Sequence, residues 1–254
     1  MKKVISYSLW GSSPQYTINL IKNLDLAKQF FEGWTCRVHL SPNVPQNIVN
    51  FINSRDNSEI VLMGEDEGWN GMFWRFYPAS DPTVDIMISR DCDSYLNIRD
   101  KAAVDEWIAS KKMFHIMRDH RSHSAKIMGG MWGAMQGAVP NMKSLIDNYS
   151  RKETNNRKNI DQEFLKEVIY PLVKNNSLVH DFMDRFGEGA KKFPIPRKEP
   201  MREFIQNDIL MYLNATTKEQ RSQEYKKYDN YDNDYIGRIE SVSDEDINFY
   251  KDNT

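Results

Sequence analysis

The first 64 residues alternate strands and helices, and this pattern limits the possible fold more than any other feature of the chain. β-rich runs occur at residues 4–9 (VISYSL), 35–40 (TCRVHL) and 60–64 (IVLMG), and apolar residues at helical spacing occupy 16–31 and 48–52 between them. Parallel strands need crossover connections, which are usually helices. The sequence therefore predicts an α/β protein with a mostly parallel, Rossmann-like central sheet flanked by helices.

The rest of the chain continues this pattern and then changes character. We expect a helix at 70–77, a strand that begins at Val84, a helix at 102–109, a strand at 113–119, and a helix at 161–173 that Pro171 ends or kinks. After about residue 193 the chain is proline-rich and basic, with a weak helix at 201–213, and from Thr216 it is almost entirely polar. We expect one domain at 1–197 and a polar, helical or disordered extension at 198–254.

Composition excludes several classes of protein. The chain has 254 residues, 40% of them apolar, which is enough for one large domain, and its net charge of −2 gives no general attraction to nucleic acid. Cys36 and Cys92 are too few for a disulfide framework, and we expect reduced thiols. No signal peptide is evident, and no stretch approaches the ~20 apolar residues of a membrane span. We expect a cytoplasmic protein with no nucleic-acid partner and no membrane span.

Residues 84–95 (VDIMISRDCDSY) form an apolar run that ends in two aspartates, Asp91 and Asp93. If the strand continues, alternation places both carboxylates on one side. Sheets of this kind bind ligands at the carboxyl ends of their strands, and two carboxylates there suit Mg²⁺ or Mn²⁺, which in turn suits a diphosphate. Asp-x-Asp-Ser is also ordinary turn chemistry, so the triplet alone leaves a surface turn open.

The ordered set of motifs resembles the GT-A fold nucleotide-sugar glycosyltransferases, in particular a group found in large DNA viruses such as the chlorella viruses and in some bacteria. The resemblance covers about residues 4–197 and lies in RFYPASDPTVDIMISRDCDS (75–94), FHIMRDH (114–120), MGGMWG (128–133), DQEFL (161–165), and YPLV (170–173) with the later HD (180–181). It implies a metal-dependent enzyme that transfers a sugar from a nucleoside diphosphate sugar, with a UDP-sugar favoured, to a saccharide or glycan acceptor.

The resemblance also implies a metal site. In similar enzymes the residue at Asp93 ligates Mn²⁺ or Mg²⁺, while the residue at Asp91 contacts the ribose or the metal, which places the Asp91–Cys92–Asp93 segment against the donor. A late histidine is often a further ligand, and His180 is the best-placed candidate. Imidazole suits Mn²⁺ better than Mg²⁺. The alternative for His180 is a surface histidine at a helix end.

Donor binding is expected after the first strand, where the resemblance places the base. Ser8 and Leu9 are expected to read the base edge with backbone groups, Trp10 to cover an aromatic or sugar face, and Gly11 to permit a tight turn. A buried Trp10 at the strand end is the alternative. The aromatic neighbours of Arg75 predict burial with a carboxylate or phosphate partner. By resemblance, Arg75 pairs with the donor sugar or with the first aspartate of the triplet.

Two further motifs carry candidates for catalysis. Asp161 and Gln162 open a helix, and the resemblance places this pair near the donor sugar and the acceptor hydroxyl, with Asp161 as the catalytic candidate. An ordinary helix cap is the alternative for Asp161. Gly129 and Gly130 allow close backbone approach to a ligand, and Trp132 offers a stacking platform, although a packed turn would explain the same residues.

Charged residues elsewhere are harder to assign. Lys191, Lys192 and Arg197 are candidates to close over the diphosphate, or form a solvated charge run. Arg90 is expected to be structural. The cluster at 115–123 comprises His115, Arg118, Asp119, His120, Arg121 and His123. Alternation scatters these side chains over both strand faces, so we expect Arg118 and Asp119 near the donor and His120 and His123 in a loop.

Two other functional classes remain open. A metal-dependent phosphohydrolase or nuclease would use Asp91, Asp93 and the pair His180–Asp181, and a sugar-binding module would keep the fold without turnover. A nucleotide-sugar pyrophosphorylase needs a Gly- and Arg-rich loop after the first strand, which residues 8–14 (SLWGSSP) do not supply.

Overall fold

The computed structural model describes residues 1–64, 68–152, 158–197 and 235–252. In these residues, seven strands form one sheet in the order β3-β2-β1-β4-β6-β5-β7. The strands are β1 (Lys3–Leu9), β2 (Thr35–Leu40), β3 (Ser58–Leu62), β4 (Ile86–Ser89), β5 (Phe114–Arg118), β6 (Trp132–Met135) and β7 (Ser177–Asp181). β6 is antiparallel to β4 and β5, and the other neighbours are parallel. The predicted fold class, a mostly parallel α/β sheet, is confirmed.

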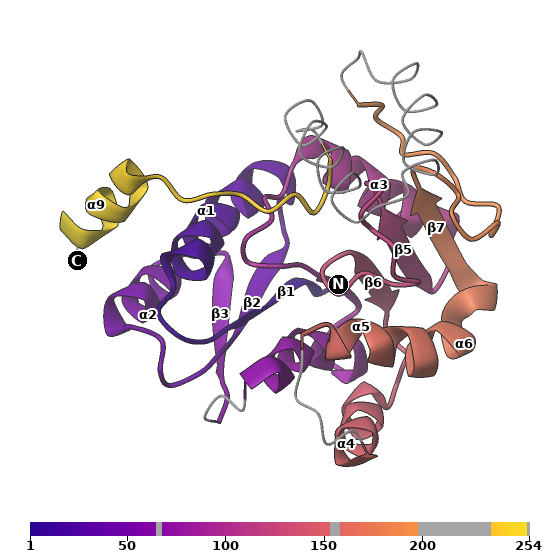
Figure 1. The fold of residues 1–254 in the computed structure, drawn as a ribbon, viewed down its shortest axis with the longest axis horizontal. Helices are drawn as coiled ribbons and strands as arrows, with labels where there is room; N and C mark the ends of the chain where they lie inside the picture. The colour runs from indigo at the N-terminus through magenta and orange to yellow at the C-terminus, as the bar shows by residue number, and fades with distance from the viewer. Residues whose placement is uncertain (65–67, 153–157, 198–234, 253–254) are drawn as a thin grey trace, which may run out of the picture.

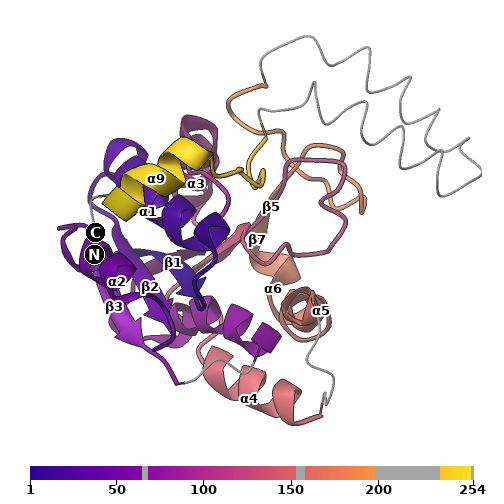
Figure 2. The same ribbon diagram turned by 60° about the vertical axis from the view of Figure 1, so that its left-hand side comes forward.

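Helices cover both faces of the sheet. They are α1 (Pro14–Phe30), α2 (Gln46–Asn53), the 3-10 helix η1 (Gly68–Ser80), α3 (Ile98–Ser110), α4 (Met142–Lys152), α5 (Ile160–Phe164), α6 (Tyr170–Val173), the 3-10 turn η3 (Lys174–Asn176) and α9 (Asp244–Asp252). In both views α1 and α4 lie on opposite sides of the sheet (Figures 1 and 2). No helix of the described residues is both long enough and apolar enough to cross a membrane.

Alternation along the central strands divides the core between the two faces. Ile86 and Ile88 of β4 pack in one apolar cluster, with residues of α1, α2 and α3. Met87 points the other way and packs in a second cluster, with residues of η1, α4 and α5. A strand that is buried on both faces has a continuous run of apolar residues, which is why the sequence just before Asp91 contains few polar residues.

The register of the sheet decides which loops meet. β1 runs parallel to β4, with Ser6 beside Ser89, so the residues that follow both strands emerge at the same edge. β6 runs the opposite way, with Trp132 beside Ser89, so the residues that precede β6 emerge there too. The loop after β1, the aspartate triplet and the glycine pair are thus brought together by strand direction alone.

Several elements differ from the sequence predictions. The segment at 70–77 is a 3-10 helix, not an α-helix, and β6 and β7 were not predicted as strands. Pro171 does not end the helix that begins at Ile160, because a π turn over Leu165–Ile169 precedes it and the helix continues through α6. A proline ring clashes with the carbonyl four residues earlier, and the wider turn accommodates this. The predicted helix at 201–213 lies outside the described residues.

The carboxyl-terminal residues that the structure describes do not behave as a loose appendage. Figure 2 shows α9 beside α1, and Lys22 of α1 forms an ion pair with Asp246 of α9 at 2.7 Å. Ile236 is buried against Met117 and Met131 in a third apolar cluster. At residues 235–252 the expected boundary at 197 therefore does not separate two independent units.

Candidate functional site

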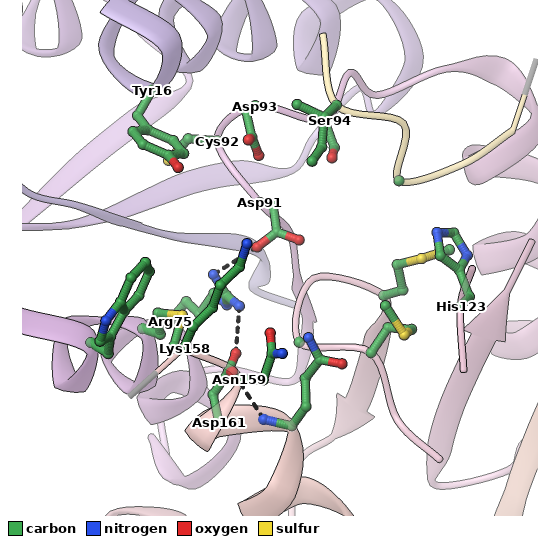
Figure 3. Close-up of a pocket in the computed structure, with 18 of the residues that line it drawn as sticks. Tyr16, Arg75, Asp91, Cys92, Asp93, Ser94, His123, Lys158, Asn159 and Asp161 are labelled. Carbon is green, nitrogen blue, oxygen red and sulfur yellow. Dashed lines mark hydrogen bonds and ion pairs between the residues drawn. The ribbon is translucent and has the colours of Figure 1, made fainter. Parts of the chain in front are cut away.

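A pocket of about 430 Å³ opens at the edge of the sheet where these loops meet. Asp91, Asp93, Arg75 and Asp161 all line it, as do Gly129 and residues of the carboxyl-terminal segment. Figure 3 shows Arg75 between Asp91 and Asp161. The structure thus brings together four charged residues that the sequence analysis had proposed from three separate motifs.

The two aspartates of the triplet reach the pocket from a turn, not from a strand. β4 ends at Ser89, and the backbone N–H of Ser94 donates to the carbonyl of Asp91 at 3.4 Å. Alternation therefore does not place the carboxylates, although both line the same pocket. The Asp91 side chain is 39% exposed, whereas Asp93 is buried. The triplet is thus a turn, and its two carboxylates line a pocket at the carboxyl edge of the sheet.

Arg75 connects the two acidic parts of the pocket. Its guanidinium donates from Nη1 to Asp91 Oδ1 at 2.8 Å and from Nη2 to Asp161 Oδ2 at 2.9 Å. Its backbone N–H donates to Ser8 Oγ at 2.9 Å, which fixes η1 against the end of β1. Arg75 is buried among aromatic side chains, as predicted, and it pairs with the first aspartate.

Asp161 is held rigidly at the start of α5. Its carboxylate accepts the backbone N–H of Gln162 at 2.9 Å as well as the Arg75 bond, and the residue is only 1% exposed. The residue that caps the helix is Asn159, not Asp161, and it adopts a left-handed backbone with φ 71°. A non-glycine residue in that conformation stores strain, and such residues cluster at functional sites.

The packing around the pocket leaves no room for a side chain at Gly129 or Gly130. A β-carbon at Gly129 would overlap the Asp161 carboxylate and the Arg75 guanidinium. A β-carbon at Gly130 would overlap the Asp91 carboxylate and lie 2.8 Å from the Asp91 backbone nitrogen. The expectation that these glycines permit close approach is correct, but what approaches them in the structure is the acidic cluster.

The pocket carries excess negative charge. Burial, together with the neighbouring charge of Asp91, raises the pKa of Asp93 to about 6. Burial also raises the pKa of Asp161, against the opposing effect of Arg75. Burial by itself lowers the pKa of Arg75, but Asp91 and Asp161 outweigh it and the net shift is upward. Asp91, Asp93 and Asp161 therefore outnumber the cationic side chains that line the pocket, Arg75 and Lys158.

Aromatic side chains surround the mouth of the pocket. Trp10, Tyr16 and Trp69 all line it, and Tyr16 and Trp69 are among the exposed large apolar residues of the described chain. Trp10 packs edge-on against Trp74, with ring centroids 6.2 Å apart, and its ring lies against Gly71. Trp10 is half-buried, so both readings of this residue, packing and ligand contact, hold in part.

The other residues expected after β1 do not line the pocket with their side chains. Leu9 is buried in the core, Ser8 accepts the Arg75 bond, and the backbone N–H of Gly11 donates to Asn43 Oδ1 at 2.7 Å. Gly11 has φ 71°, as a tight turn requires. Cys92 lines the pocket, and its thiol donates to the Ser8 carbonyl at 3.1 Å.

The structure does not bring His180, the predicted further metal ligand, to the two aspartates. His180 lies in β7, fully buried, where its Nδ1 is 2.8 Å from His115 Nε2 and its Nε2 is 3.1 Å from Glu106. It does not line the pocket that contains the aspartates. The alternative of a surface histidine at a helix end is not what the structure shows either, because His180 lies in β7, which pairs with β5 and buries the ring.

The structure does not place Lys191, a candidate to close over the diphosphate, at the pocket either. Lys191 Nζ donates to Glu106 at 2.7 Å, outside the pocket, and its backbone pairs with His180. Arg197 Nη2 donates to Asp119 at 3.3 Å, and neither it nor Lys192 lines the pocket. Lys191 and Arg197 are thus paired with acidic side chains outside the pocket.

Three further candidates are structural in this fold. Trp132 is fully buried and stacked on Phe114, with centroids 5.1 Å apart, so it offers no platform to a sugar. Arg118 pairs with Asp181 at 2.6 Å, and Asp119 pairs with Arg99 at 2.6 Å, both outside the pocket. Buried charged side chains need partners of opposite charge, and Arg118 and Asp119 are both paired with other residues of the chain.

The remaining predictions for the 90–123 region are correct. Arg90 is structural, because its guanidinium donates to both oxygens of Asp100 at 2.9 Å and 2.6 Å. His120 and His123 lie beyond β5 in a loop, as expected. His123 additionally lines the pocket, which its position in the sequence did not indicate.

Several pocket residues were missed by the sequence analysis. Tyr16, Trp69 and Lys158 line the pocket, as do Tyr235, Gly237 and Ile239 from the carboxyl-terminal segment. Lys158 stands three residues before Asp161, a proximity that was available from the sequence. The apolar and glycine residues at 235–239 (YIGRI) interrupt a polar tail, and this interruption was the signal that the segment packs on something.

The fold and the pocket together define a class: an α/β protein with an acidic, aromatic-rimmed pocket at the carboxyl edge of its sheet. No family model matches the sequence, and no curated protein matches it. Among solved structures, a glycosyltransferase involved in the glycosylation of the major capsid of PBCV-1 is 18% identical, with 71% of this chain and 82% of that chain covered and a TM-score of 0.49.

A second solved structure, a 4-diphosphocytidyl-2C-methyl-D-erythritol synthase from Anaerococcus prevotii DSM 20548, is 9% identical. It covers 83% of this chain and 98% of that chain, with a TM-score of 0.46. At these identities and TM-scores, neither similarity assigns an activity to the chain.

Proposed function

We propose that this protein is a glycosyltransferase that moves a sugar from a nucleoside diphosphate sugar, with a UDP-sugar favoured, to a saccharide or glycan acceptor. The observation that carries the proposal is the Arg75 fork between Asp91 and Asp161, with Asp93 in the same pocket. Departure of a diphosphate from a sugar creates negative charge on one side of the broken bond and positive charge on the other. A pocket with both a cation-binding pair and a fixed carboxylate suits both charges.

Asp91 and Asp93 fit a divalent cation. Burial, with the neighbouring charge of Asp91 as the next cause, raises the pKa of Asp93 to about 6, so a cation beside this carboxylate would stabilise its charged form. In the described ranges no three His, Cys, Asp or Glu side chains form a metal group by themselves. Mg²⁺ and Mn²⁺ sites that include substrate phosphates often use only one or two carboxylates. When bound, such an ion supplies a Lewis acid that neutralises the leaving diphosphate.

The roles of the other residues follow from their positions. Arg75 fixes the orientation of Asp91 and Asp161 and balances part of their charge. Asp161, buried and doubly hydrogen-bonded, provides a fixed negative charge toward the sugar, and Gln162 follows it on the same helical turn. Trp10 and Tyr16 provide aromatic surface at the end of the pocket near β1, where a base can stack.

The rival classes are less well supported by the geometry. A phosphohydrolase or nuclease using His180–Asp181 with the aspartate triplet would need both pairs in one site, and they are separated. A sugar-binding module without turnover would not require a buried ion-paired carboxylate at its centre. A pyrophosphorylase would need basic residues in the loop after β1, and none occurs between Trp10 and Pro14.

The test is nucleotide release. UDP-hexoses and GDP-hexoses are incubated with the protein and Mn²⁺, with and without chelator, and free UDP or GDP is measured. We expect metal-dependent release of nucleoside diphosphate. Release of sugar phosphate or inorganic phosphate would instead indicate a phosphohydrolase, and production of pyrophosphate from a nucleoside triphosphate and a sugar phosphate would indicate a nucleotidyltransferase.

A single substitution tests the metal pair. Asp93→Ala is expected to lower the metal-dependent affinity for the donor by about 100-fold or more, because the remaining Asp91 is already paired with Arg75. The fold should persist, since the parent carboxylate is itself unfavourably buried. Asp105→Ala, at an exposed position of α3, is the matched control. If Asp93→Ala binds the donor as tightly as the parent in Mn²⁺ titrations, the metal assignment fails.

A further inference from the structure

Residues 235–240, a segment from the carboxyl-terminal part of the chain, form one wall of the pocket. This wall lies opposite the end of the pocket near β1. Tyr235, Gly237 and Ile239 of this segment line the pocket together with Asp91 and Asp93. In Figure 3 this part of the chain, drawn in pale yellow, passes beside Ser94. Asp91 and Asp93 are more than a hundred positions before this segment in the sequence.

One end of the segment is fastened to the aspartate triplet itself. The backbone N–H of Glu240 donates to the Asp93 carbonyl at 2.7 Å, and Ile239 forms an antiparallel bridge with Ser94. The Glu240 carbonyl accepts Gln15 Nε2 at 2.6 Å and Asn19 Nδ2 at 2.8 Å. The segment thus joins the turn that carries Asp93 to helix α1.

The other end is fastened beside β5. The backbone N–H of Ile236 donates to Asp119 Oδ2 at 3.0 Å, and its side chain is 2% exposed. Tyr235 stacks on His120 with ring centroids 4.2 Å apart. Gly237, at φ 83°, lets the chain turn where a β-carbon would lie 2.7 Å from Met131 Sδ. A segment fixed at both ends is a built part of the pocket.

The chemistry of this wall differs from that of the acidic centre. Its lining consists of Met128, Met131, His123, Tyr235 and Ile239, with the hydroxyl groups of Ser94 and Ser122 nearby. No carboxylate or cationic side chain belongs to this set. His123 accepts the Asp119 backbone N–H at its Nδ1, 3.0 Å away, so its ring is neutral and Nε2 carries the proton. Apolar surface with a few hydroxyl partners suits a neutral ligand that has both an apolar face and hydroxyl groups.

We infer that residues 235–240 form the acceptor wall of the pocket and that the acceptor is a neutral pyranoside. The inference rests on the proposed glycosyl transfer, because it assigns the second substrate of that reaction. The apolar face of a pyranose packs on Ile239 and Met131, and its hydroxyl groups meet Ser94, Ser122 and His123. A charged sugar would lose its hydration against this wall without gaining a partner.

The experiment compares substitution of Ile239 with a matched control. Ile239 is 66% exposed, so Ile239→Ser should fold, and Leu172→Ser changes a residue of similar exposure, 62%, on α6 outside the pocket. Neutral methyl pyranosides and the corresponding methyl uronosides are the probes. Their binding is measured by saturation-transfer NMR without donor, and their stimulation of UDP release is measured with donor and Mn²⁺.

We expect neutral pyranosides to bind and to stimulate release, and uronosides to do neither. Ile239→Ser should weaken pyranoside binding and raise the acceptor KM by about fivefold or more, with a smaller change in the donor KM, whereas Leu172→Ser matches the parent. The inference fails if no neutral pyranoside binds, if uronosides bind equally well, or if Ile239→Ser leaves binding unchanged. If pyranosides bind but no UDP is released, the proposed sugar transfer is contradicted, whereas the assignment of residues 235–240 as a pyranoside-binding wall is still supported.

Discussion

Among single residues, Arg75 controls the electrostatics of the pocket most directly. One terminal nitrogen reaches Asp161 on α5, 86 positions away in the sequence, and the other reaches Asp91 after β4. Only a planar guanidinium can donate in two fixed directions at once. A lysine would present one point charge and leave one carboxylate without its partner.

Arg75→Lys tests this bridging role. We expect kcat to fall by about 100-fold or more, since the fixed charges no longer face the reacting sugar correctly, and the free energy of unfolding to fall by about 3 kcal/mol. Arg90→Lys is the control, because Arg90 makes a comparable bidentate pair with Asp100 outside the pocket. Equal losses of kcat in the two folded variants would contradict the assignment.

The predictions for single residues differ in whether the structure places the residue at the pocket. Asp91, Asp93, Arg75 and Asp161 all line one pocket. The sequence pointed to them by a carboxylate pair after an apolar run, an arginine among aromatic residues, and the family resemblance of the DQEFL motif. The structure places His180 and Trp132 away from this pocket. Both belong to short strands whose burial depends on partners elsewhere in the sheet, and no local pattern reveals those partners.

At the scale of elements, the antiparallel direction of β6 is decisive. A parallel strand at this position would carry its preceding loop to the opposite edge of the sheet. Because β6 is reversed, Gly129 and Gly130 meet Asp91 and Asp161. The glycine-dense segment was predicted to approach a ligand, but its short strand was not predicted, since four residues that include glycine and alanine carry little β-propensity.

Gly130→Ala tests how closely this element packs on the site. The added methyl group overlaps the Asp91 carboxylate and backbone, so we expect loss of about 1–3 kcal/mol of stability and a loss of nucleotide release of about 100-fold. Gly64→Ala is the control, because nothing lies within 4 Å of its added methyl group. Differential scanning calorimetry and UDP release give the two readouts, and a Gly130→Ala enzyme with parental activity would refute the close contact.

At the scale of the whole molecule, the histidines predict a pH dependence. All five histidines of the chain are buried. Burial lowers the pKa of His39 to about 4 and those of His120 and His123 to about 3, and it lowers those of His115 and His180 as well. Their neutral forms are therefore the ones that the fold accepts.

The sign of the effect follows from proton binding. In the unfolded chain these histidines bind protons near pH 6.5, whereas in the folded protein they do so only at lower pH. Stability is therefore full above pH 6.5 and is lost as the pH falls toward 4, by about 1–2 kcal/mol at pH 5 for each of His39, His120 and His123. Asp93, whose pKa is raised to about 6, opposes this loss as it gains a proton.

We expect the Tm to fall steeply between pH 6.5 and 5, measured by calorimetry in chelator without donor. His39→Asn, which removes a buried histidine distant from the pocket, should reduce the slope by the equivalent of about one proton. Most Asp and Glu side chains do not titrate in this window, so they do not account for the fall. A Tm that stays constant from pH 7.5 to 5 would contradict the prediction.

The sequence alone determined the succession of elements, the mostly parallel sheet, and the position of the acidic triplet at a strand end. These depend on periodicities of two and 3.6 residues, which are properties of adjacent positions. Only the tertiary structure decided that Arg75 joins Asp91 to Asp161, that His180 is buried away from them, and that residues 235–240 close the pocket. Such pairings depend on strand direction and on which distant segments bury each other, and that is set by packing of the whole chain.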